Sequence, residues 1–173
     1  KQKFTSTFLE YMKMMKPLFI GLNSMYRNKI GHNDIKDENI MYDIDGYKFI
    51  DFGLSSGFSN KKYYENRSKS EFLYDRIYPP YPYEFIYLYA TPEYLEDEID
   101  NINNKDYRSM HDRYITIHEI LFSRKNVNKD LIELANKYIT KGNRIRNGKE
   151  GRNIISLIDT YSLGILIPYM LYK

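Results

Sequence analysis

Two short segments contain the polar residues with the clearest chemical potential. They are His32-Asn33-Asp34-Ile35-Lys36-Asp37-Glu38-Asn39 and, further along the chain, Ile50-Asp51-Phe52-Gly53. Carboxylate, amide and amine groups of this kind bind hard cations and move protons. Taken alone, an Asp-x-Lys sequence in a loop is usually a solvated turn, and the tripeptide Asp-Phe-Gly recurs by chance. The information lies in the joint spacing, in which Asn39 stands five residues after Asp34.

This joint pattern resembles the catalytic loop H-R-D-x-x-x-x-N and the D-F-G motif of protein kinases. A third segment, Asp159-Thr160-Tyr161-Ser162-Leu163-Gly164, is similar to D-x-[WY]-S-x-G, which begins the long buried helix under the kinase catalytic loop. The resemblance covers 4–56 and 154–173 well and the middle poorly. It implies a mainly α fold, a kinase-like C-terminal lobe with a small β-hairpin at the catalytic loop and no N-lobe. Residues 1–173 are thus predicted to form a partial protein kinase domain.

The resemblance also implies the roles of the site residues. Phosphoryl transfer depends on positioning and charge neutralisation. Asp34 would orient the substrate hydroxyl and accept its proton, and Lys36 would neutralise the transferring phosphate, so these are the expected catalytic residues. Asn39 and Asp51 would bind Mg²⁺ as hard oxygen ligands. Met41 would form the floor of the adenine pocket, and it joins Asn39 and Asp51 as an expected cofactor-binding residue for ATP and Mg²⁺.

Supporting residues follow from the same resemblance. Phe52 would pack on His32, and Gly53 would give the backbone freedom that the activation segment needs where it starts. Asp159 would accept backbone N–H bonds from the catalytic loop and hold its shape from below. Lys36, at the D-x-K position, favours serine/threonine over tyrosine specificity.

The sequence departs from the family pattern in its nucleotide-binding part and at one catalytic-loop position. These 173 residues contain neither a Gly-rich loop nor a strand with the ATP-binding lysine. We therefore expect an N-lobe from the same or another chain, and little kinase activity from this stretch alone. Asn33 replaces the arginine that normally pairs with a phosphorylated residue of the activation segment. Asparagine makes no charge-assisted bidentate pair, so activation by loop phosphorylation is not expected.

Three places stand as alternatives for the A-P-E sequence that closes the activation segment. They are Tyr81-Pro82-Tyr83-Glu84, Ala90-Thr91-Pro92-Glu93 and Leu95-Glu96-Asp97-Glu98. Glu84 is slightly favoured, because Pro79-Pro80-Tyr81-Pro82 resembles the Pro-rich version in kinase-like proteins of large DNA viruses. On any choice the distance to Asp159 is long for a kinase, which predicts an insertion at about 99–153.

The elements that must position these residues follow from hydrophobic periodicity. An apolar helical face predicts helix over 4–29, divided in two by Pro17. The strands of a hairpin are expected at 40–42 and 47–50, with Asp45-Gly46 as the turn. The remaining expectations are a long loop over 54–90, helices at about 106–122 and 128–140, a basic loop over 141–152, and a buried helix from Ile154 onwards.

Composition limits the class of protein. The formal charge of +3, from 26 basic and 23 acidic residues, is too small to favour nucleic acid as a partner. The absence of cysteine excludes disulfides and thiolate metal sites. His111 and His118 lack the further ligands that a metal site needs. Without a run of eighteen apolar residues we expect no membrane partner and an intracellular, cytoplasmic protein. The composition, rich in Tyr and without Trp, is typical of proteins encoded by AT-rich genomes, and in this it resembles that of the divergent kinases of large DNA viruses. A viral origin would place the protein in a virion or a host cell.

The expected function is a serine/threonine protein kinase that transfers the γ-phosphate of ATP to a protein hydroxyl. The alternative is a kinase-like binding or structural module, a pseudokinase, in which catalysis is dispensable. A small-molecule phosphotransferase fits less well, because such enzymes usually have a shorter activation segment. The basic segment 141–152 is either solvated surface or a docking patch for acidic substrates.

Overall fold

The computed structural model describes residues 2–73, 81–104 and 127–172, and this part of the chain is mainly helical. Its α-helices are α1 (Gln2–Arg27), α2 (Lys61–Leu73), α3 (Tyr83–Tyr87), α4 (Pro92–Asn104), α6 (Val127–Asn147) and α7 (Lys149–Tyr172). Its strands are β1 (Ile30–Gly31), β2 (Ile40–Asp43), β3 (Gly46–Phe49) and β4 (Ser56–Gly57), and one 3-10 turn, η1, spans Asp37–Asn39. The helix expected at 106–122, with His111 and His118, lies outside the described residues.

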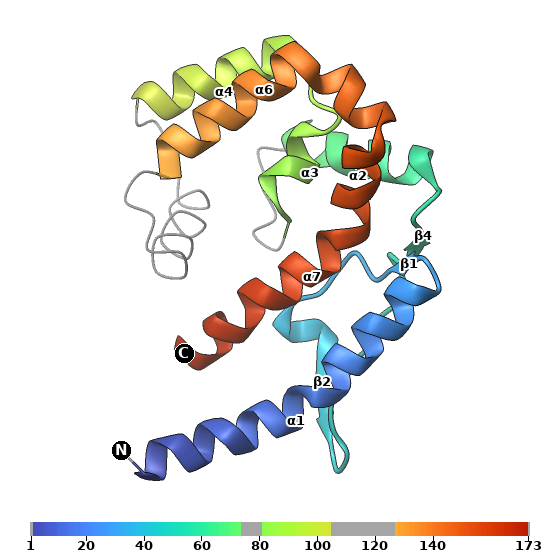
Figure 1. Cartoon of the computed structure of the whole chain (residues 1–173), viewed down its shortest axis with the longest axis vertical. Coiled ribbons are helices and arrows are strands. Elements are labelled where there is room, and N and C mark those ends of the chain that lie inside the picture. The colour runs from blue at the N-terminus through green and yellow to red at the C-terminus, as the bar shows by residue number, and fades with distance from the viewer. Residues whose placement is uncertain (1, 74–80, 105–126, 173) are drawn as a thin grey trace.

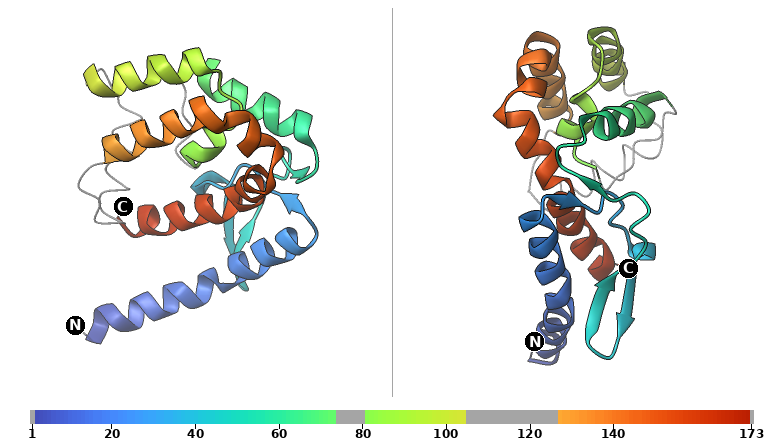
Figure 2. Two further views of the ribbon diagram at one scale, coloured as in Figure 1. Left: turned by 45° about the horizontal axis from the view of Figure 1, so that its top comes forward. Right: turned by 90° about the vertical axis from the view of Figure 1, so that its right-hand side faces the viewer.

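The described elements form two groups that share α7 (Figure 1). Helices α4 and α6 pack against each other at one end, with α2 and α3 beneath them. Helix α1 and the β2–β3 hairpin lie at the other end, and α7 runs from the first group to the second (Figures 1 and 2). The catalytic-loop segment lies between the two groups, where α7 passes (Figure 1).

Two hydrophobic cores correspond to these groups, and α7 contributes to both. Ile155 and Ile158 belong to the core around α2, α3, α4 and α6, whereas Leu163 and Leu166 belong to the core beside α1. Burying each of these side chains stabilises the fold by roughly 1.5–3 kcal/mol. Asp159 lies between the two pairs along α7. The position of this residue is therefore determined from both sides.

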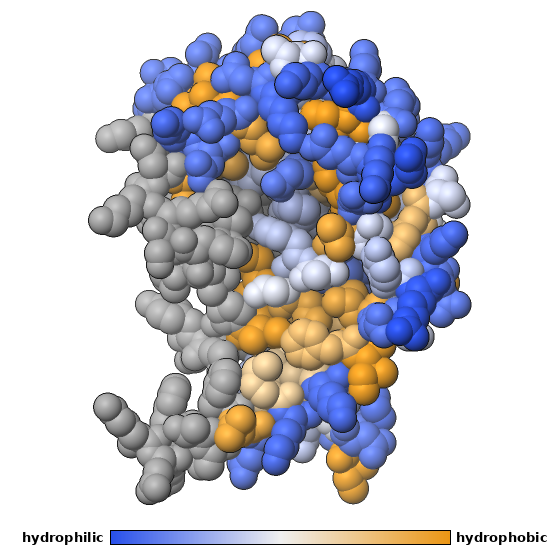
Figure 3. Space-filling model, viewed as in Figure 1, coloured by the Kyte–Doolittle hydropathy of each residue, from blue (hydrophilic) through white to orange (hydrophobic). Residues whose placement is uncertain are grey.

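Surface character also differs between the two groups (Figure 3). The face over α4 and α6 is largely hydrophilic, while apolar residues gather around α7 and α1. Exposed large apolar side chains are found on α1, on the hairpin and after it, among them Ile20, Met41, Tyr42, Ile44 and Phe52. None of the helices in the described ranges is both long and apolar enough to cross a bilayer.

Helix α1 continues through Pro17, so the prediction of two helices was wrong. Proline removes one intrahelical hydrogen bond and crowds the preceding turn. Tertiary packing offsets this cost, because Met15 and Leu18 are fully buried on either side of it. The Pro17 ring also lies beside Gly46 of the hairpin: a Cβ added to Gly46 would come within 3.3 Å of the Pro17 Cγ.

The hairpin turn is displaced by one residue from the predicted Asp45-Gly46. Strands β2 and β3 pair antiparallel, with Asp43 opposite Gly46, so that Ile44 and Asp45 form the loop. The Asp45 N–H donates to the Asp43 side chain over 2.9 Å, which stabilises the turn locally. Gly46 has a φ of 112°, and an added Cβ would stand 2.7 Å from the Met14 carbonyl oxygen. Glycine is needed here for both its conformation and its size.

The segment 54–90, predicted to be a loop, contains β4, α2 and α3 within its described part. Its many tyrosines mask the helical pattern, because the described aromatic residues, all buried or half-buried, do not repeat at a helical spacing. Tyr64 and Ser68 are four residues apart and are both fully buried on one face of α2. The Ser68 hydroxyl donates to the carbonyls of Phe85 and Ile86, which joins α2 to α3. Tertiary packing therefore decided the structure of this segment.

The predicted basic loop at 141–152 is also wrong. The helix expected at 128–140 continues as α6 to Asn147, and α7 begins at Lys149. Arg146 donates from Nε to the Leu88 carbonyl over 2.9 Å and lies over the Tyr89 ring at 5.2 Å. This arginine joins α6 to the segment after α3, so it is not a free docking group.

We expect Gly46→Ala to destabilise the protein by about 2 kcal/mol or more, because alanine is strained at this φ and its Cβ would collide with the backbone of α1. A loss of this size lowers the thermal midpoint by roughly 5 °C, which differential scanning fluorimetry measures. Gly142→Ala is the matched control, since nothing lies within 4 Å of an added Cβ inside α6. It should be neutral or slightly stabilising, and equal behaviour of the two variants would contradict the predicted packing.

Candidate active site

A single carboxylate holds the catalytic-loop backbone from below. The Asp159 side chain accepts the N–H of His32 over 2.6 Å and the N–H of Asn33 over 2.8 Å, one on each oxygen. This confirms the predicted role of Asp159. The residue is 5% exposed, and burial raises the pKa of its carboxyl, while the two backbone N–H groups act in the opposite direction. Without Asp159, both N–H groups would be buried with no acceptor among these contacts.

Asn33 connects four parts of the structure. Its backbone is left-handed, with a φ of 62°, a conformation that asparagine tolerates better than most residues. Its side-chain Nδ2 donates to the carbonyls of Gly31 and Leu54, each over 3.1 Å. Its own carbonyl accepts the hydroxyl of Tyr81. The residue thus connects α7, β1, the segment after Gly53 and the segment before α3.

His32 is fully buried and joins the two sequence motifs. Its ring lies 4.7 Å from that of Phe52 and 5.5 Å from that of Phe49, centroid to centroid. The predicted packing of Phe52 on His32 is therefore confirmed. The ring Nε2 also stands 3.0 Å from the Ile50 carbonyl oxygen, so one imidazole connects the catalytic loop to both sides of Asp51.

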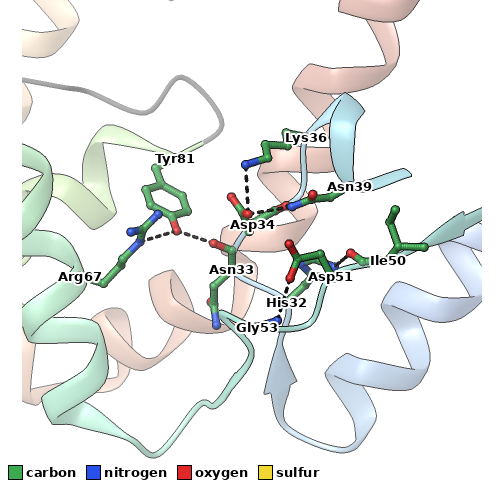
Figure 4. Close-up of polar contacts among 10 residues, drawn as sticks. All are labelled: His32, Asn33, Asp34, Lys36, Asn39, Ile50, Asp51, Gly53, Arg67 and Tyr81. Atoms are coloured by element: carbon green, nitrogen blue, oxygen red, sulfur yellow. Dashed lines mark hydrogen bonds and ion pairs between the residues drawn. The ribbon is translucent and has the colours of Figure 1, made fainter. Parts of the chain in front are cut away.

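The Asp34 carboxylate is oriented by two neighbours. Asn39 donates from Nδ2 to the Asp34 carboxylate over 2.7 Å and to the Asp34 carbonyl over 2.8 Å (Figure 4). The Lys36 amine lies 3.2 Å from the same carboxylate oxygen. Asn39 is buried in η1 and Asp34 is 8% exposed, whereas the Lys36 side chain is 34% exposed. The group is therefore held rigidly on one side and reaches solvent on the other.

Asp51 lies beside this group. The Ile50 N–H donates to the Asn39 carbonyl over 2.9 Å, which brings the chain next to Asn39 just before Asp51, and Figure 4 shows Asp51 close to Asp34 and Asn39. The Asp51 φ is 58°, and its side chain accepts the Gly53 N–H over 3.1 Å. The side chain is exposed. A left-handed aspartate is a strained conformation of the kind that gathers at functional sites.

The donor atoms suit Mg²⁺ better than a transition metal. No group of three or more His, Cys, Asp or Glu residues within the described ranges could hold a metal ion. Mg²⁺ needs only one or two protein carboxylates when phosphates and waters complete its shell. Since Nδ2 of Asn39 is directed to Asp34, its side-chain oxygen is left for a cation, and the exposed Asp51 carboxylate would supply a second oxygen ligand.

The remaining predicted residues lie nearby or elsewhere. Met41 is on β2 opposite Lys48, and the residue is 49% exposed. Of the three glutamates that were alternatives for the end of the activation segment, Glu84 and Glu93 are exposed in the first turns of α3 and α4. Glu98 is 6% exposed and accepts the Tyr87 hydroxyl over 3.4 Å. Burial thus singles out Glu98, while the assignment of the A-P-E glutamate stays a prediction.

Sequence reasoning missed two residues that contact the catalytic loop. Tyr81 donates its hydroxyl to the Asn33 carbonyl, and Arg67 donates from Nε to that hydroxyl over 2.9 Å (Figure 4). Arg67 belongs to no recognised motif, and Tyr81, although it begins one of the three alternatives for A-P-E, is one of 19 tyrosines in the chain and was given no role. Only the folded arrangement of α2 and the segment before α3 brings them to this place.

We expect Asp159→Asn to lower the free energy of unfolding by about 2 kcal/mol, because an amide has one oxygen for two N–H donors and leaves one of them unsatisfied. Urea denaturation measures the change. Glu150→Gln, which removes an exposed carboxylate from the first turn of the same helix, should cost under about 0.5 kcal/mol. Similar losses in both variants would contradict the special role of Asp159.

Comparison with known proteins agrees with this geometry. The model of the protein kinase domain family matches residues 1–112. Probable cyclin-dependent kinase 9 of Caenorhabditis elegans is 38% identical over 61 residues, which are 35% of this chain and 13% of that protein. Serine/threonine-protein kinase LATS2 of Homo sapiens is 42% identical over 55 residues, 30% of this chain and 5% of that protein. Cyclin-dependent kinase 9-A of Xenopus laevis is 44% identical over 57 residues, 32% of this chain and 15% of that protein.

The chain therefore spans only a small share of the length of these relatives. No solved structure matches it. The family model nevertheless covers more than half of the chain, including both motifs around Asp34 and Asp51. On this match, the chain belongs to the protein kinase domain family.

Proposed function

We propose that this chain forms the catalytic C-terminal lobe of a serine/threonine protein kinase, which transfers the γ-phosphate of ATP to a protein hydroxyl. The observation that carries the proposal is the oriented Asp34 carboxylate, held by Asn39 and Lys36 beside the exposed Asp51. These four side chains occur together, and three of them are tied to one another by hydrogen bonds or ion pairs. Phosphoryl transfer needs this combination of a proton acceptor, a cation and oxygen ligands.

Asp34 is the proposed acceptor for the proton of the substrate hydroxyl. One of its carboxylate oxygens receives the Asn39 amide and the Lys36 amine, which fixes the plane of the carboxylate. Because both contacts are made to Oδ2, they also set the direction of the Oδ1 oxygen of Asp34. A carboxylate held in this way aligns a hydroxyl for attack without having to reorganise.

Lys36 is the proposed counter-charge for the transferring phosphoryl group. Its amine is anchored at Asp34, yet its side chain reaches solvent, so that it can contact a phosphate at the same place where the hydroxyl binds. The position also supports serine/threonine specificity, as the D-x-K pattern implies.

Asn39 and Asp51 are the proposed Mg²⁺ ligands. A magnesium ion bound there would bridge phosphate oxygens and neutralise the developing negative charge. The Asn39 side chain is held by Asp34, and Asp51 is held by the Gly53 N–H, so both oxygens are oriented before binding.

Met41 is proposed to contact the adenine ring of ATP. It lies two residues after Asn39 on β2 and is 49% exposed, and Phe52 is 52% exposed. Such exposure of large apolar side chains supports a nucleotide and a second, glycine-rich lobe covering this edge, contributed by the same or another chain. The segment at about 99–153 is proposed as an insertion beside the substrate site.

The alternative is a kinase-like module in which catalysis is dispensable. We favour the enzyme because Asp34, Lys36, Asn39 and Asp51 occur together, a combination that a module that only binds partners need not keep. The substitution described next separates the two functions.

We expect Asp34→Asn in the full-length protein to lower phosphoryl transfer by about 10²–10⁴-fold, because the hydroxyl loses its proton acceptor. Folding should be preserved, since asparagine still offers an oxygen to Asn39. Transfer of radiolabelled phosphate from ATP to a generic basic protein measures the activity. Glu38→Gln, an exposed neighbour in η1, is the matched control and should keep full activity. Equal activity of Asp34→Asn and the parent would favour the binding module.

We expect Asp51→Asn to raise the Mg²⁺ concentration for half-maximal transfer about tenfold or more, because a neutral amide replaces a charged ligand. Titration of activity with Mg²⁺ at fixed ATP measures this shift. Asp45→Asn makes the same chemical change in the exposed hairpin loop and should leave the Mg²⁺ requirement unchanged. An unshifted titration for Asp51→Asn would remove this residue from the proposed metal site.

A further inference from the structure

We propose that Tyr81, supported by Arg67, is a positioning residue that holds the catalytic loop in its working arrangement and makes a phosphorylated activation segment unnecessary. The inference deepens the proposed function and rests on it. It follows from the contacts of Asn33, which occupies the position of the arginine that would clamp a phosphate.

Tyr81 holds the peptide group between Asn33 and Asp34. Its carbonyl, which belongs to Asn33, accepts the Tyr81 hydroxyl. The N–H of the same asparagine is held by Asp159 from the opposite element, α7. Residue 33 is therefore held at both of its backbone polar groups, immediately before the proposed catalytic carboxylate. A rotation of this peptide would turn Asp34 and break the Tyr81 contact, while Asp159 holds the preceding peptide at the Asn33 N–H.

The asparagine side chain adds a second connection to the activation segment. Nδ2 of Asn33 donates to the Leu54 carbonyl, just after Gly53, and Tyr63 of α2 donates its hydroxyl to the same carbonyl. Both the beginning of the activation segment and the later Tyr81 are thus bonded to the residue that precedes Asp34. These connections need neither a phosphate nor an arginine at position 33.

Tyr81 is well placed for a permanent contact. It is 1% exposed, and its ring packs edge-on against Phe85, with 5.3 Å between the centroids. Arg67 lies 5.4 Å from the Tyr81 ring centroid and donates from Nε to the hydroxyl. A cationic donor polarises the hydroxyl, which strengthens its own hydrogen bond to the Asn33 carbonyl. Because the hydroxyl is buried and engaged on both sides, it acts as a fixed structural contact.

The first experiment replaces Tyr81 by Phe in the full-length protein, which removes the hydroxyl and retains the ring packing. We expect kcat to fall about tenfold, the order expected for one buried hydrogen bond, while the KM for ATP stays within about twofold. This division between kcat and KM distinguishes positioning from a general loss of structure. An unchanged kcat would overturn the proposal.

Tyr138→Phe is the matched control. Tyr138 is also a buried tyrosine, 3% exposed, and it lies on α6 in the core around α2, α3, α4 and α6. Its hydroxyl has no hydrogen-bond partner in the described part of the chain. We expect its kcat to equal that of the parent. An equal fall in both variants would mean that kcat responds to core changes in general, which overturns a specific role of Tyr81.

The second experiment tests the contribution of Arg67 by a double-mutant cycle. Arg67→Lys keeps the charge but loses the Nε donor. We expect it to lower kcat in the parent and to have little further effect in the Tyr81→Phe background, because both act through one hydroxyl. Fully additive effects would show that Arg67 acts elsewhere and would overturn its part in the proposal.

The third experiment tests independence from phosphorylation. After treatment with a broad-specificity phosphatase, confirmed by mass spectrometry, the parent should keep its kcat within about twofold. A fall of tenfold or more on dephosphorylation would show that a phosphate is required and would overturn the proposal.

Amide hydrogen exchange separates failure of this inference from failure of the proposed function. In Tyr81→Phe, but not in Tyr138→Phe, we expect exchange about tenfold faster over residues 31–35 and 54–58. A parent without transfer activity would refute the proposed function, and the exchange rates would still decide whether Tyr81 holds the loop. Unchanged exchange in Tyr81→Phe would refute the inference even if the parent is an active kinase.

Discussion

The arrangement of the site depends on the buried Asp159 carboxylate and the two backbone N–H groups that it accepts. This residue lies on α7 between Ile158, which packs in one core, and Leu163, which packs in the other. Two independent sets of apolar contacts therefore determine where the carboxylate stands. Burial of a charged group is costly unless hydrogen bonds compensate for it, and His32 and Asn33 supply them. These two hydrogen bonds attach the backbone of the catalytic loop to α7.

Backbone strain near Asp34 fits with this anchoring. Asn33 and Asp51 both have positive φ angles, at 62° and 58°, although neither is glycine. Each such residue costs of order 1–3 kcal/mol and persists only where neighbouring contacts determine it. Asn33 is held by hydrogen bonds at its N–H, carbonyl and side chain, and Asp51 by the Gly53 N–H and the flanking His32–Phe52 packing. Two of the described positive-φ residues that are not glycine thus lie at the site, one just before Asp34 and one at Asp51, while the third, Lys29, lies just after α1.

Charge plays a more local part than the net composition indicates. The basic segment around α6 and α7 divides by contact: Arg146 holds the Leu88 carbonyl, Lys137 pairs with Glu150, and Arg144 and Arg152 are exposed. Exposed pairs of this kind contribute little to stability, whereas the Arg146 contact joins two elements. Two described cations lie close to the proposed chemistry: Lys36 pairs with Asp34, and Arg67 donates to the Tyr81 hydroxyl, which contacts the catalytic loop.

By itself, the sequence determined the residue types of the site and the period of its longest helices. The spacing of Asp34, Asn39 and Asp51 and the apolar faces of α1, α6 and α7 were predictable because they depend on neighbours along the chain. The helices of 54–104 were not, since their aromatic residues do not repeat at a helical spacing and are buried only through contact with other elements. Pro17 remained inside a helix for the same reason, as packing against the hairpin offset a local preference. The Tyr81 and Arg67 contacts with Asn33 were decided by tertiary structure alone, because a hydrogen bond across 48 residues leaves no periodic signal in the sequence.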